Sequence, residues 1–191
     1  ATVQLWLQQT LTSDVYVSLA GSSRDRLRQS LSPELLSQLA RIDGVASLST
    51  GRPREVDSRF GPVRLLALGD APHVASGFRF KQYEPDPLVG YRRGESGFVS
   101  EAFAYHNGVS VGDSVRLDGA RAPHGFRVGA IYFDYSAERG MISIDRATYA
   151  RIWGDTGVTT AGIRFAEDAD RDAVTARVRG LAARSGQSLW V

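Results

Sequence analysis

The fold is decided by residues 98–155, which read FVSEAFAYHNGVSVGDSVRLDGARAPHGFRVGAIYFDYSAERGMISIDRATYARIWGD. Ser100 stands directly before Glu101 and is placed to cap a short helix that runs to His106. Asn107 and Gly108 then end this helix, because both residues tolerate the left-handed backbone conformation. The stretch therefore opens with one short capped helix.

Two extended runs follow in the same stretch. Ser114 to Leu117 and Phe126 to Phe133 are rich in β-branched and aromatic residues, which favour strands. A polar loop with Gly and Pro, Asp118 to Gly125, separates them. The sequence therefore predicts a hairpin with a long connection.

A third strand and a second helix complete the stretch. Met141 to Ile144 is a short apolar run, and Asp145 is placed to cap a helix from Arg146 to Trp153 that stops at Gly154. Residues 98–155 thus form a compact module in which every element has a start or stop signal.

Upstream of the module, the chain alternates between strand and helix patterns. Residues 14–19 alternate as a strand does, and Ser32 and Pro33 begin a helix that ends at Gly44. Further strands are predicted at residues 45–50, 54–57 and 63–68, the last two paired across a turn at residues 60–62. This strand, helix, strand, strand order is half of a split βαβ fold.

The missing half of that fold lies downstream of the module. Thr159 to Phe165 is predicted as a strand, Asp168 as the start of a helix that ends before Gly186, and Ser188 to Val191 as a last strand. We therefore predict an α+β protein whose outer domain is split by the insertion of the central module.

Two segments stand outside this pattern. Val3, Trp6, Leu7, Thr10 and Leu11 recur at helical spacing and predict an amphipathic N-terminal helix, either a stalk or a helix docked on its own domain. The segment Asp70 to Gly97 is expected to be the least regular part of the chain. It carries four aromatic residues, for which we weigh contact with a partner or apolar ligand against filling the joint between subdomains: Phe78, Phe80, Tyr83 and Tyr91.

Composition narrows the class of protein. The chain has 191 residues, 42% of them hydrophobic and 23% charged, so it is globular and large enough to bury a core. Its net charge is only +2 and its arginines are dispersed, which argues against a nucleic-acid partner. It has no cysteine and no apolar run near the roughly 20 residues that cross a bilayer. Because it begins at Ala1 and ends within a predicted strand, we interpret it as a piece of a longer polypeptide.

No constellation for catalysis or metal binding is evident. The histidines His73, His106 and His124 lack partners at metal-ligand spacing, and Ser96 lacks a nucleophile elbow. There is no phosphate-binding loop or dinucleotide fingerprint. Four carboxylates could form a calcium site or an acid and base pair, but no known ligand spacing groups them, and local capping and turn roles explain them better: Asp134, Glu138, Asp145 and Asp155.

Short motifs of this sequence resemble the extracytoplasmic domain of FtsX-like ABC transporter permeases, a group that includes MacB, LolC and LolE. The resemblance extends to residues 6–19 and 33–44 and is closest to the second such domain of permeases that carry two. The motifs are Val99-Ser100-Glu101, Gly108-Val109-Ser110-Val111-Gly112-Asp113, Phe126-Arg127-Val128, Ile131-Tyr132-Phe133-Asp134-Tyr135, Arg139-Gly140, Asp145-Arg146-Ala147-Thr148-Tyr149 and Trp153-Gly154-Asp155.

The resemblance implies a ferredoxin-like (split βαβ, porter-like) outer domain with an inserted small β-rich (sabre-like) subdomain. We expect residues 1–87, with an N-terminal stalk helix, and residues 158–191 to form the outer α+β subdomain. Residues 88–157 would be the inserted subdomain.

The function implied by the resemblance is that of a non-catalytic periplasmic domain of an inner-membrane permease. It would transmit ATP-driven motion to export or extract a hydrophobic substrate such as a lipid, lipoprotein, peptide or drug. ATP would act on a separate cytoplasmic ATPase subunit, so no cofactor is expected in this domain. The expected partners are the membrane-spanning remainder of the permease, the ATPase, a second permease copy or periplasmic domain, and a periplasmic adaptor or chaperone.

Two alternatives remain. An FtsX-like docking or signalling module would recruit or activate a partner such as a cell-wall hydrolase, and an exposed aromatic patch would favour it. A soluble periplasmic enzyme or ligand-binding protein is the more distant alternative, which clustered carboxylates or a closed polar pocket would favour.

Overall fold

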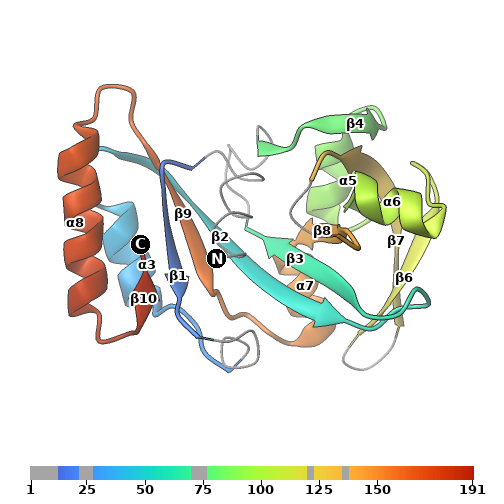
Figure 1. The fold of residues 1–191 in the computed structure, drawn as a ribbon, viewed down its shortest axis with the longest axis horizontal. Coiled ribbons are helices and arrows are strands. Elements are labelled where there is room, and N and C mark those ends of the chain that lie inside the picture. Colours follow the sequence, from blue (N-terminus) through green and yellow to red (C-terminus); the bar gives the residue numbers. More distant parts are fainter. Residues whose placement is uncertain (1–12, 22–27, 70–76, 120–122, 135–137) are drawn as a thin grey trace.

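The fold is a ten-stranded mixed β-sheet with five helices in the described part of the chain (Figure 1). The computed structural model describes residues 13–21, 28–69, 77–119, 123–134 and 138–191. The strand order is β10-β1-β9-β2-β3-β8-β5-β7-β4, and β6 pairs with β7 beside this path. The N-terminal helix predicted over residues 3–11 lies outside the described residues. The mixture of helices and sheet agrees with the predicted α+β class.

The first half of the molecule is antiparallel throughout. It contains β1 (Val15–Leu19), β9 (Thr160–Phe165), β10 (Leu189–Trp190) and the Val45–Gly51 part of β2 (Val45–Val56). Two helices, α3 (Pro33–Ala40) and α8 (Arg171–Arg184), pack on one face. Their buried side chains and those of the strands form the first core, which includes Leu39, Val158, Ile163 and Val178.

Helix caps explain where these two helices begin. Ser32 Oγ accepts a hydrogen bond from Leu35 N at 3.0 Å, which confirms the predicted start of α3. The predicted start of the last helix at Asp168 is wrong by three residues. The helix begins at Arg171 because Asp170 Oδ1 accepts from Ala173 N at 3.0 Å and serves as its cap.

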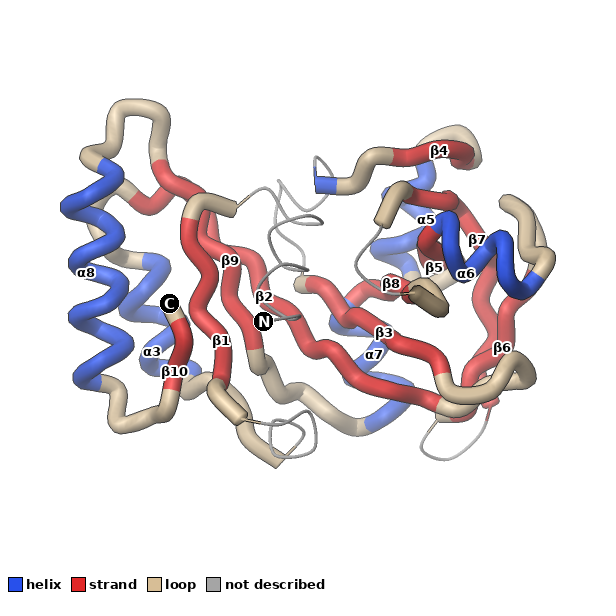
Figure 2. Tube along the Cα trace, viewed as in Figure 1, coloured by secondary structure: helices blue, strands red, loops and turns tan. Residues whose placement is uncertain are grey.

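The prediction of two separate strands over residues 45–50 and 54–57 is also wrong. The structure has one continuous strand, β2, from Val45 to Val56 (Figure 2). Pro53 suggested a break, because proline cannot donate to a ladder. Pairing of β2 with β9 ends at Gly51, so beyond that residue β2 pairs only with β3 and its other edge needs no donor at Pro53.

The second half contains the Gly51–Val56 part of β2 and six further strands. They are β3 (Val63–Leu68), β4 (Phe80–Tyr83), β5 (Ser96–Ser100), β6 (Ser114–Asp118), β7 (Pro123–Tyr132) and β8 (Met141–Asp145). β3 runs parallel to β8, and β5 runs parallel to β7. The predicted pairing is confirmed, since β6 and β7 are antiparallel neighbours, but the predicted long connection over Asp118–Gly125 is wrong, because the two strands pair as far as Asp118 and Pro123.

The outer strands of this half curl back toward the β2–β3 hairpin. Ser58 forms a bridge with Leu117 of β6, and Asp118 N donates to Asp57 O at 2.9 Å. Trp153 Nε1 in α7 (Arg146–Trp153) donates to Asp118 O at 3.2 Å. The curled sheet encloses the second core, which includes Ala67, Val115, Leu117, Phe126, Ile142, Tyr149 and Trp153.

The expected irregularity of residues 70–97 is wrong for the part that the structure describes. This part contains β4, the short helix α5 (Pro87–Arg93) and the start of β5. Its Pro and Gly residues punctuate the helix, because Pro87 stands in the first turn and Gly94 ends the helix in the left-handed conformation at φ +72°. The Pro and Gly residues that suggested a loop are therefore the start and stop signals of a short helix.

The two helix caps predicted in the central module are confirmed. Ser100 Oγ accepts from Phe103 N at 3.3 Å at the start of α6 (Glu101–Asn107), and Gly108 ends this helix at φ +61°. Asp145 Oδ2 accepts from Thr148 N at 3.0 Å at the start of α7, which ends at Gly154. Local capping chemistry thus sets the helix positions in this half.

Candidate functional site

Two of the four aromatic residues predicted as contacts lie in the interior. The exposed fractions of Phe78 and Tyr91 are 7% and 4%. Both belong to an aromatic cluster between α5 and the sheet, and the Tyr91 hydroxyl shares a 2.8 Å hydrogen bond with Ser143 Oγ. Burial raises the pKa of Tyr91 well above its ordinary value. The aromatic cluster consists of Leu66, Leu68, Phe78, Tyr91, Phe98, Ala130, Tyr132 and Met141.

The other two predicted contacts lie at the margin of this cluster. Phe80 is half-buried, and its ring centroid lies 5.1 Å from that of Phe98. Tyr83 is 62% exposed, with its ring centroid 5.8 Å from that of Phe80. Tyr83 is therefore the member of the four that offers a large accessible surface. The contact role of the group stays a prediction.

Sequence reasoning missed two other exposed side chains in the second half. Tyr105 on α6 is 83% exposed and Val89 on α5 is 48% exposed. Tyr105 follows the buried Phe103 by two positions, which places it on the opposite side of a helix with 3.6 residues per turn. That spacing was the signal available in the sequence.

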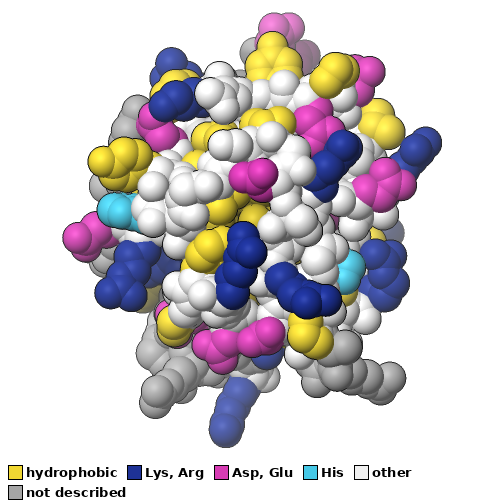
Figure 3. All heavy atoms as spheres, turned by 90° about the vertical axis from the view of Figure 1, so that its right-hand side faces the viewer, with side chains coloured by type: hydrophobic (Ala, Val, Ile, Leu, Met, Phe, Trp, Pro, Cys, Tyr) yellow, Lys and Arg dark blue, Asp and Glu magenta, His cyan; other side chains and the backbone are white. Residues whose placement is uncertain are grey.

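The end of the molecule that carries α6 and β7 has a mixed surface. Figure 3 shows apolar side chains scattered among basic and acidic ones, without one large apolar patch on this face. An ion pair between Lys81 and Glu101 joins β4 to α6 there. A partner of this face would meet aromatic and charged groups together.

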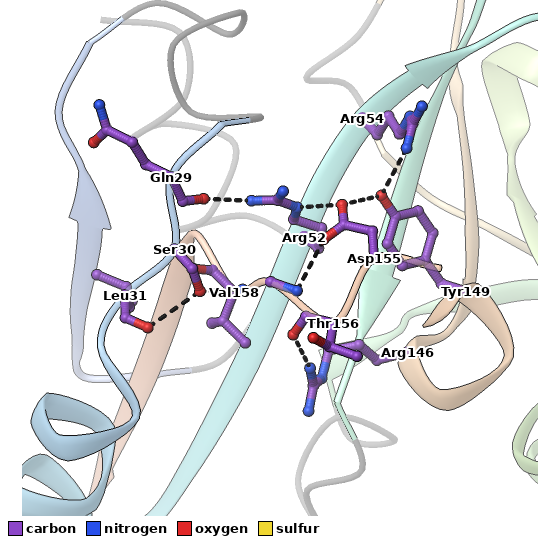
Figure 4. A network of polar contacts seen from close by, with 11 residues as sticks. Gln29, Ser30, Leu31, Arg52, Arg54, Arg146, Tyr149, Asp155, Thr156 and Val158 are labelled. Atoms are coloured by element: carbon purple, nitrogen blue, oxygen red, sulfur yellow. Dashed lines mark hydrogen bonds and ion pairs between the residues drawn. The ribbon is translucent and has the colours of Figure 1, made fainter. Parts of the chain in front are cut away.

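A network of polar side chains lies between the first and second cores (Figure 4). Arg52 Nε of β2 donates to Asp155 Oδ2 at 2.9 Å, and the Tyr149 hydroxyl of α7 donates to the same oxygen at 2.7 Å. Gly157 N donates to Asp155 Oδ1 at 2.9 Å. Both carboxylate oxygens of Asp155 are thus hydrogen-bonded.

The arginines extend this network in both directions. Arg52 Nη1 donates to Gln29 O at 2.8 Å, in the segment that connects β1 to α3. Arg54 Nη1 donates to the Tyr149 hydroxyl at 3.3 Å. The site therefore draws on β2, α7, the segment after β1 and the linker from α7 to β9, although these are distant in sequence.

Burial and charge determine the protonation states at this site. The Arg52 side chain is 4% exposed and that of Asp155 is 21% exposed. Burial by itself raises the pKa of Asp155, but hydrogen bonds from Tyr149, Gly157 and Arg52, with the charge of Arg52, lower it overall. The pKa of Tyr149 is raised, chiefly by burial. At neutral pH the site holds an ionised carboxylate and a neutral phenol.

The linker that contains Asp155 is held at further points. Val158 N donates to Ser30 Oγ at 2.9 Å, and Leu31 N donates to Val158 O at 2.7 Å. Arg146 Nη1 donates to Thr156 O at 3.1 Å. These bonds fix the path of the chain between α7 and β9.

The four carboxylates that could have formed a metal site or an acid and base pair have separate environments. Asp145 caps α7, Asp155 binds Arg52, Asp134 is buried after β7, and Glu138 is exposed. Among the described residues, no group of three or more His, Cys, Asp or Glu could hold a metal ion.

The histidines that the structure describes form no further candidate site. His73 lies outside the described residues, and His106 is exposed at the end of α6. Burial and the nearby charge of Arg151 lower the pKa of His124.

In the part of the chain with described coordinates, no helix is both long and apolar enough to span a bilayer.

Comparison with known proteins gives one curated sequence relative and several structural neighbours. No family model matches the chain. It is 28% identical over 181 residues to an uncharacterized ABC transporter permease protein of Mycobacterium tuberculosis. The alignment covers 91% of this chain and 21% of that protein, so the chain spans about a fifth of its curated relative.

Solved structures share the fold over almost the whole chain. The periplasmic region of MacB from Actinobacillus actinomycetemcomitans superposes with a TM-score of 0.69 at 12% identity, covering 96% of this chain and 90% of that one. The extracellular domain of the noncanonic ABC-type transporter YknZ from Gram-positive bacteria gives a TM-score of 0.63 at 15% identity. It covers 93% of this chain and 98% of that one. At these identities the likeness establishes the fold.

Proposed function

We propose that this chain, which has the fold of the extracytoplasmic domains of MacB/FtsX-like ABC transporter permeases, is such a domain of a longer permease. The observation that carries the proposal is the structural match across 96% of the chain, together with the sequence match to a permease. The chain would lie outside the cytoplasmic membrane, attached to membrane-spanning segments of its parent protein.

The arrangement of the first half supports the finer description of the fold. The order β10-β1-β9-β2, antiparallel throughout, with α3 after β1 and α8 after β9, is the pattern of a ferredoxin-like domain. The remaining elements enter between β2 and β9, which fits a porter-like outer domain that carries an inserted sabre-like subdomain. β3 and β4, which precede residue 88, pair with β8 and β7 of this inserted part.

The proposed role is mechanical. A separate cytoplasmic ATPase would hydrolyse ATP, and the membrane helices would carry the motion to this domain. Movement of the domain against a second copy or second periplasmic domain would then export or extract a hydrophobic substrate. The dense polar site between the two cores supports this role, because it can hold the two halves in one orientation while force passes between them.

The side chains of the polar site support a role without catalysis. A general base needs an oxygen that can reach a substrate proton. Both oxygens of Asp155 already accept hydrogen bonds, and the guanidinium of Arg52 is nearly fully buried. Asp155 is therefore suited to structure and poorly suited to proton transfer.

Docking or signalling is the second candidate function. The exposed side chains of Tyr83, Val89 and Tyr105 favour it, since exposed aromatic residues are common at protein contacts. In this case the domain would recruit or activate an extracytoplasmic partner such as a cell-wall hydrolase, or an adaptor or chaperone of a transport system. A test is alanine replacement of Tyr83 and Tyr105 in the full-length permease, which should impair partner binding while the domain stays folded.

Accessibility in intact cells tests the proposed location. The chain has no cysteine, so Ala176→Cys on the exposed side of α8 introduces one thiol into this domain. In the full-length permease, with any cysteines elsewhere replaced, a membrane-impermeant maleimide should label it in intact cells. Labelling that occurs only after lysis would contradict the proposed extracytoplasmic location.

A further inference from the structure

We propose that β2 contains a hinge at Gly51 and that the Arg52–Asp155 ion pair is a latch that fixes the angle between the two halves of the molecule. The inference concerns the internal mechanics of the chain and goes beyond the proposed function. It can be tested on the 191-residue chain without knowledge of a substrate.

Strand register places the hinge. β9 pairs with β2 over Val45–Gly51, and β3 pairs with β2 over Gly51–Val56. Gly51 is the one residue of β2 that both ladders share, with strand neighbours on its two sides. Figure 2 shows β2 running from one half into the other. The sheet is therefore continuous through the middle of the molecule by way of a single strand.

The two cores on the face of the sheet that α3, α6, α7 and α8 cover are separate. The first core contains Val158 and Ile163, and the second contains Ala67 and Tyr149. Arg52 is the register partner of Ala67, so its side chain lies on this same face. The boundary between the cores is thus occupied by the polar side chains of Arg52 and Asp155 where apolar packing is interrupted.

The latch ties together the segments that would separate if the hinge opened. The Arg52 guanidinium binds Gln29 O from the first half and Asp155 from the linker that follows α7. A Cβ on Gly157 would lie 2.9 Å from Arg52 Cζ, so the linker backbone packs directly over the guanidinium. The latch residue Arg52 is the immediate neighbour of the hinge residue Gly51.

The opposite face of the sheet suggests the direction of motion. Tyr16 of β1 pairs with Gly162 and packs against the aromatic cluster of the second half. This apolar contact involves none of the latch residues on the other face. Opening would therefore occur on the face that carries Arg52 and Asp155, with the Tyr16 contact as the fulcrum.

Pulsed electron paramagnetic resonance measures the angle directly. Spin labels are attached at Ala176→Cys on α8 and His106→Cys on α6, both exposed positions in different halves. With the native latch we expect one narrow distance distribution. Asp155→Asn should shift its mean or replace it by a broad distribution, because the ion pair that holds the linker is lost.

Two further variants make the test specific. Asp43→Asn is the matched control, since it removes an exposed ion pair with Arg177 inside the first half and should leave the distribution unchanged. If Asp155→Asn does not fold, Tyr149→Phe removes the hydroxyl that binds Asp155 and should broaden the distribution to a smaller degree. A narrow, unshifted distribution in a folded latch variant would overturn the proposal.

Hydrogen exchange gives an independent local measurement. The amides of Leu31, Gly157 and Val158 all donate within the latch region. Asp155→Asn should accelerate their exchange, while the amides of Arg127 and Val128 in the second half keep their protection. Equal acceleration at both sets would indicate general destabilisation and would also overturn the proposal.

Discussion

At the scale of single residues, Asp155 shows that a local sequence pattern can miss the long-range contacts of a side chain. In the sequence it is an acidic residue after Gly154, where aspartate is favoured by turn formation. In the structure it accepts hydrogen bonds from Arg52, Tyr149 and the Gly157 amide. The partners come from positions 103 residues upstream and 6 residues upstream as well as from the turn itself.

The lowered pKa of Asp155 predicts a specific dependence of stability on pH. Its pKa in the folded state lies below the ordinary value of 3.8, so the stabilisation is fully present above that value and is lost as the pH falls through the folded pKa. The difference in unfolding free energy between the native chain and Asp155→Asn should be constant at neutral pH and shrink in this acid range. Urea denaturation at a series of pH values measures it.

Tyr149→Phe provides the comparison for this measurement. The Tyr149 hydroxyl bond helps to lower the pKa of Asp155, so its removal should raise that pKa. The loss of stability should then be smaller, and complete at a higher pH, in the Tyr149→Phe background than in the native chain. A difference between native and Asp155→Asn chains that stays flat through the acid range would contradict the assignment.

At the scale of elements, capping residues determine where helices begin, and one cap has a second role. Ser100 Oγ accepts from Phe103 N, as the sequence predicted, and also from Met141 N of β8 at 2.9 Å. Ser100 is fully buried, so both amides depend on this one hydroxyl. The serine thereby joins the start of α6 to a strand 41 residues later.

Ser100→Ala should therefore destabilise the chain more than an ordinary cap replacement. The loss of the cap, together with a second buried N–H that is left without an acceptor, should cost about 2 to 4 kcal/mol. Ser32→Ala is the matched control. The Ser32 hydroxyl caps α3 by accepting a hydrogen bond from Leu35 N, and its removal should cost about 1 kcal/mol. Equal losses in thermal or urea unfolding would show that the bond to Met141 contributes little.

At the scale of the whole molecule, two cores share one face of a sheet whose halves are joined through β2. The first core is built by α3, α8 and strands of the first half, and the second by the curled sheet with α6 and α7. Because Gly51 is the sole residue of β2 paired on both sides, damage to one core should pass to the other only weakly.

Leu39→Ala tests this independence. Leu39 is fully buried in the first core, and its truncation should cost about 3 kcal/mol there. Hydrogen exchange should accelerate at amides of β9 and of the segment that α3 covers, whereas amides of β7 should retain most of their protection. Ile142→Ala, at an equally buried position of the second core, should give the reverse pattern. Uniform acceleration throughout the sheet would show one cooperative unit.

The sequence by itself determined the short-range features of this protein. It located the caps at Ser32, Ser100 and Asp145, the β6–β7 pairing and the helix ends at Gly108 and Gly154, because these depend on neighbours within a few residues. The helix end predicted at Gly44 is wrong, because α3 already ends at Ala40. Short motifs of the sequence also resemble those of permease domains, and the structural neighbours confirm this resemblance at the level of the fold.

Only the tertiary structure decided which distant segments meet. It joined two predicted strands into β2, since Pro53 lies where one neighbouring strand has ended, and it buried Phe78 and Tyr91 while leaving Tyr83 exposed. It also brought Arg52 to Asp155. The physical reason is that strand pairing and ion pairing depend on distances in space between residues that are far apart in the chain, which no local pattern of side chains records.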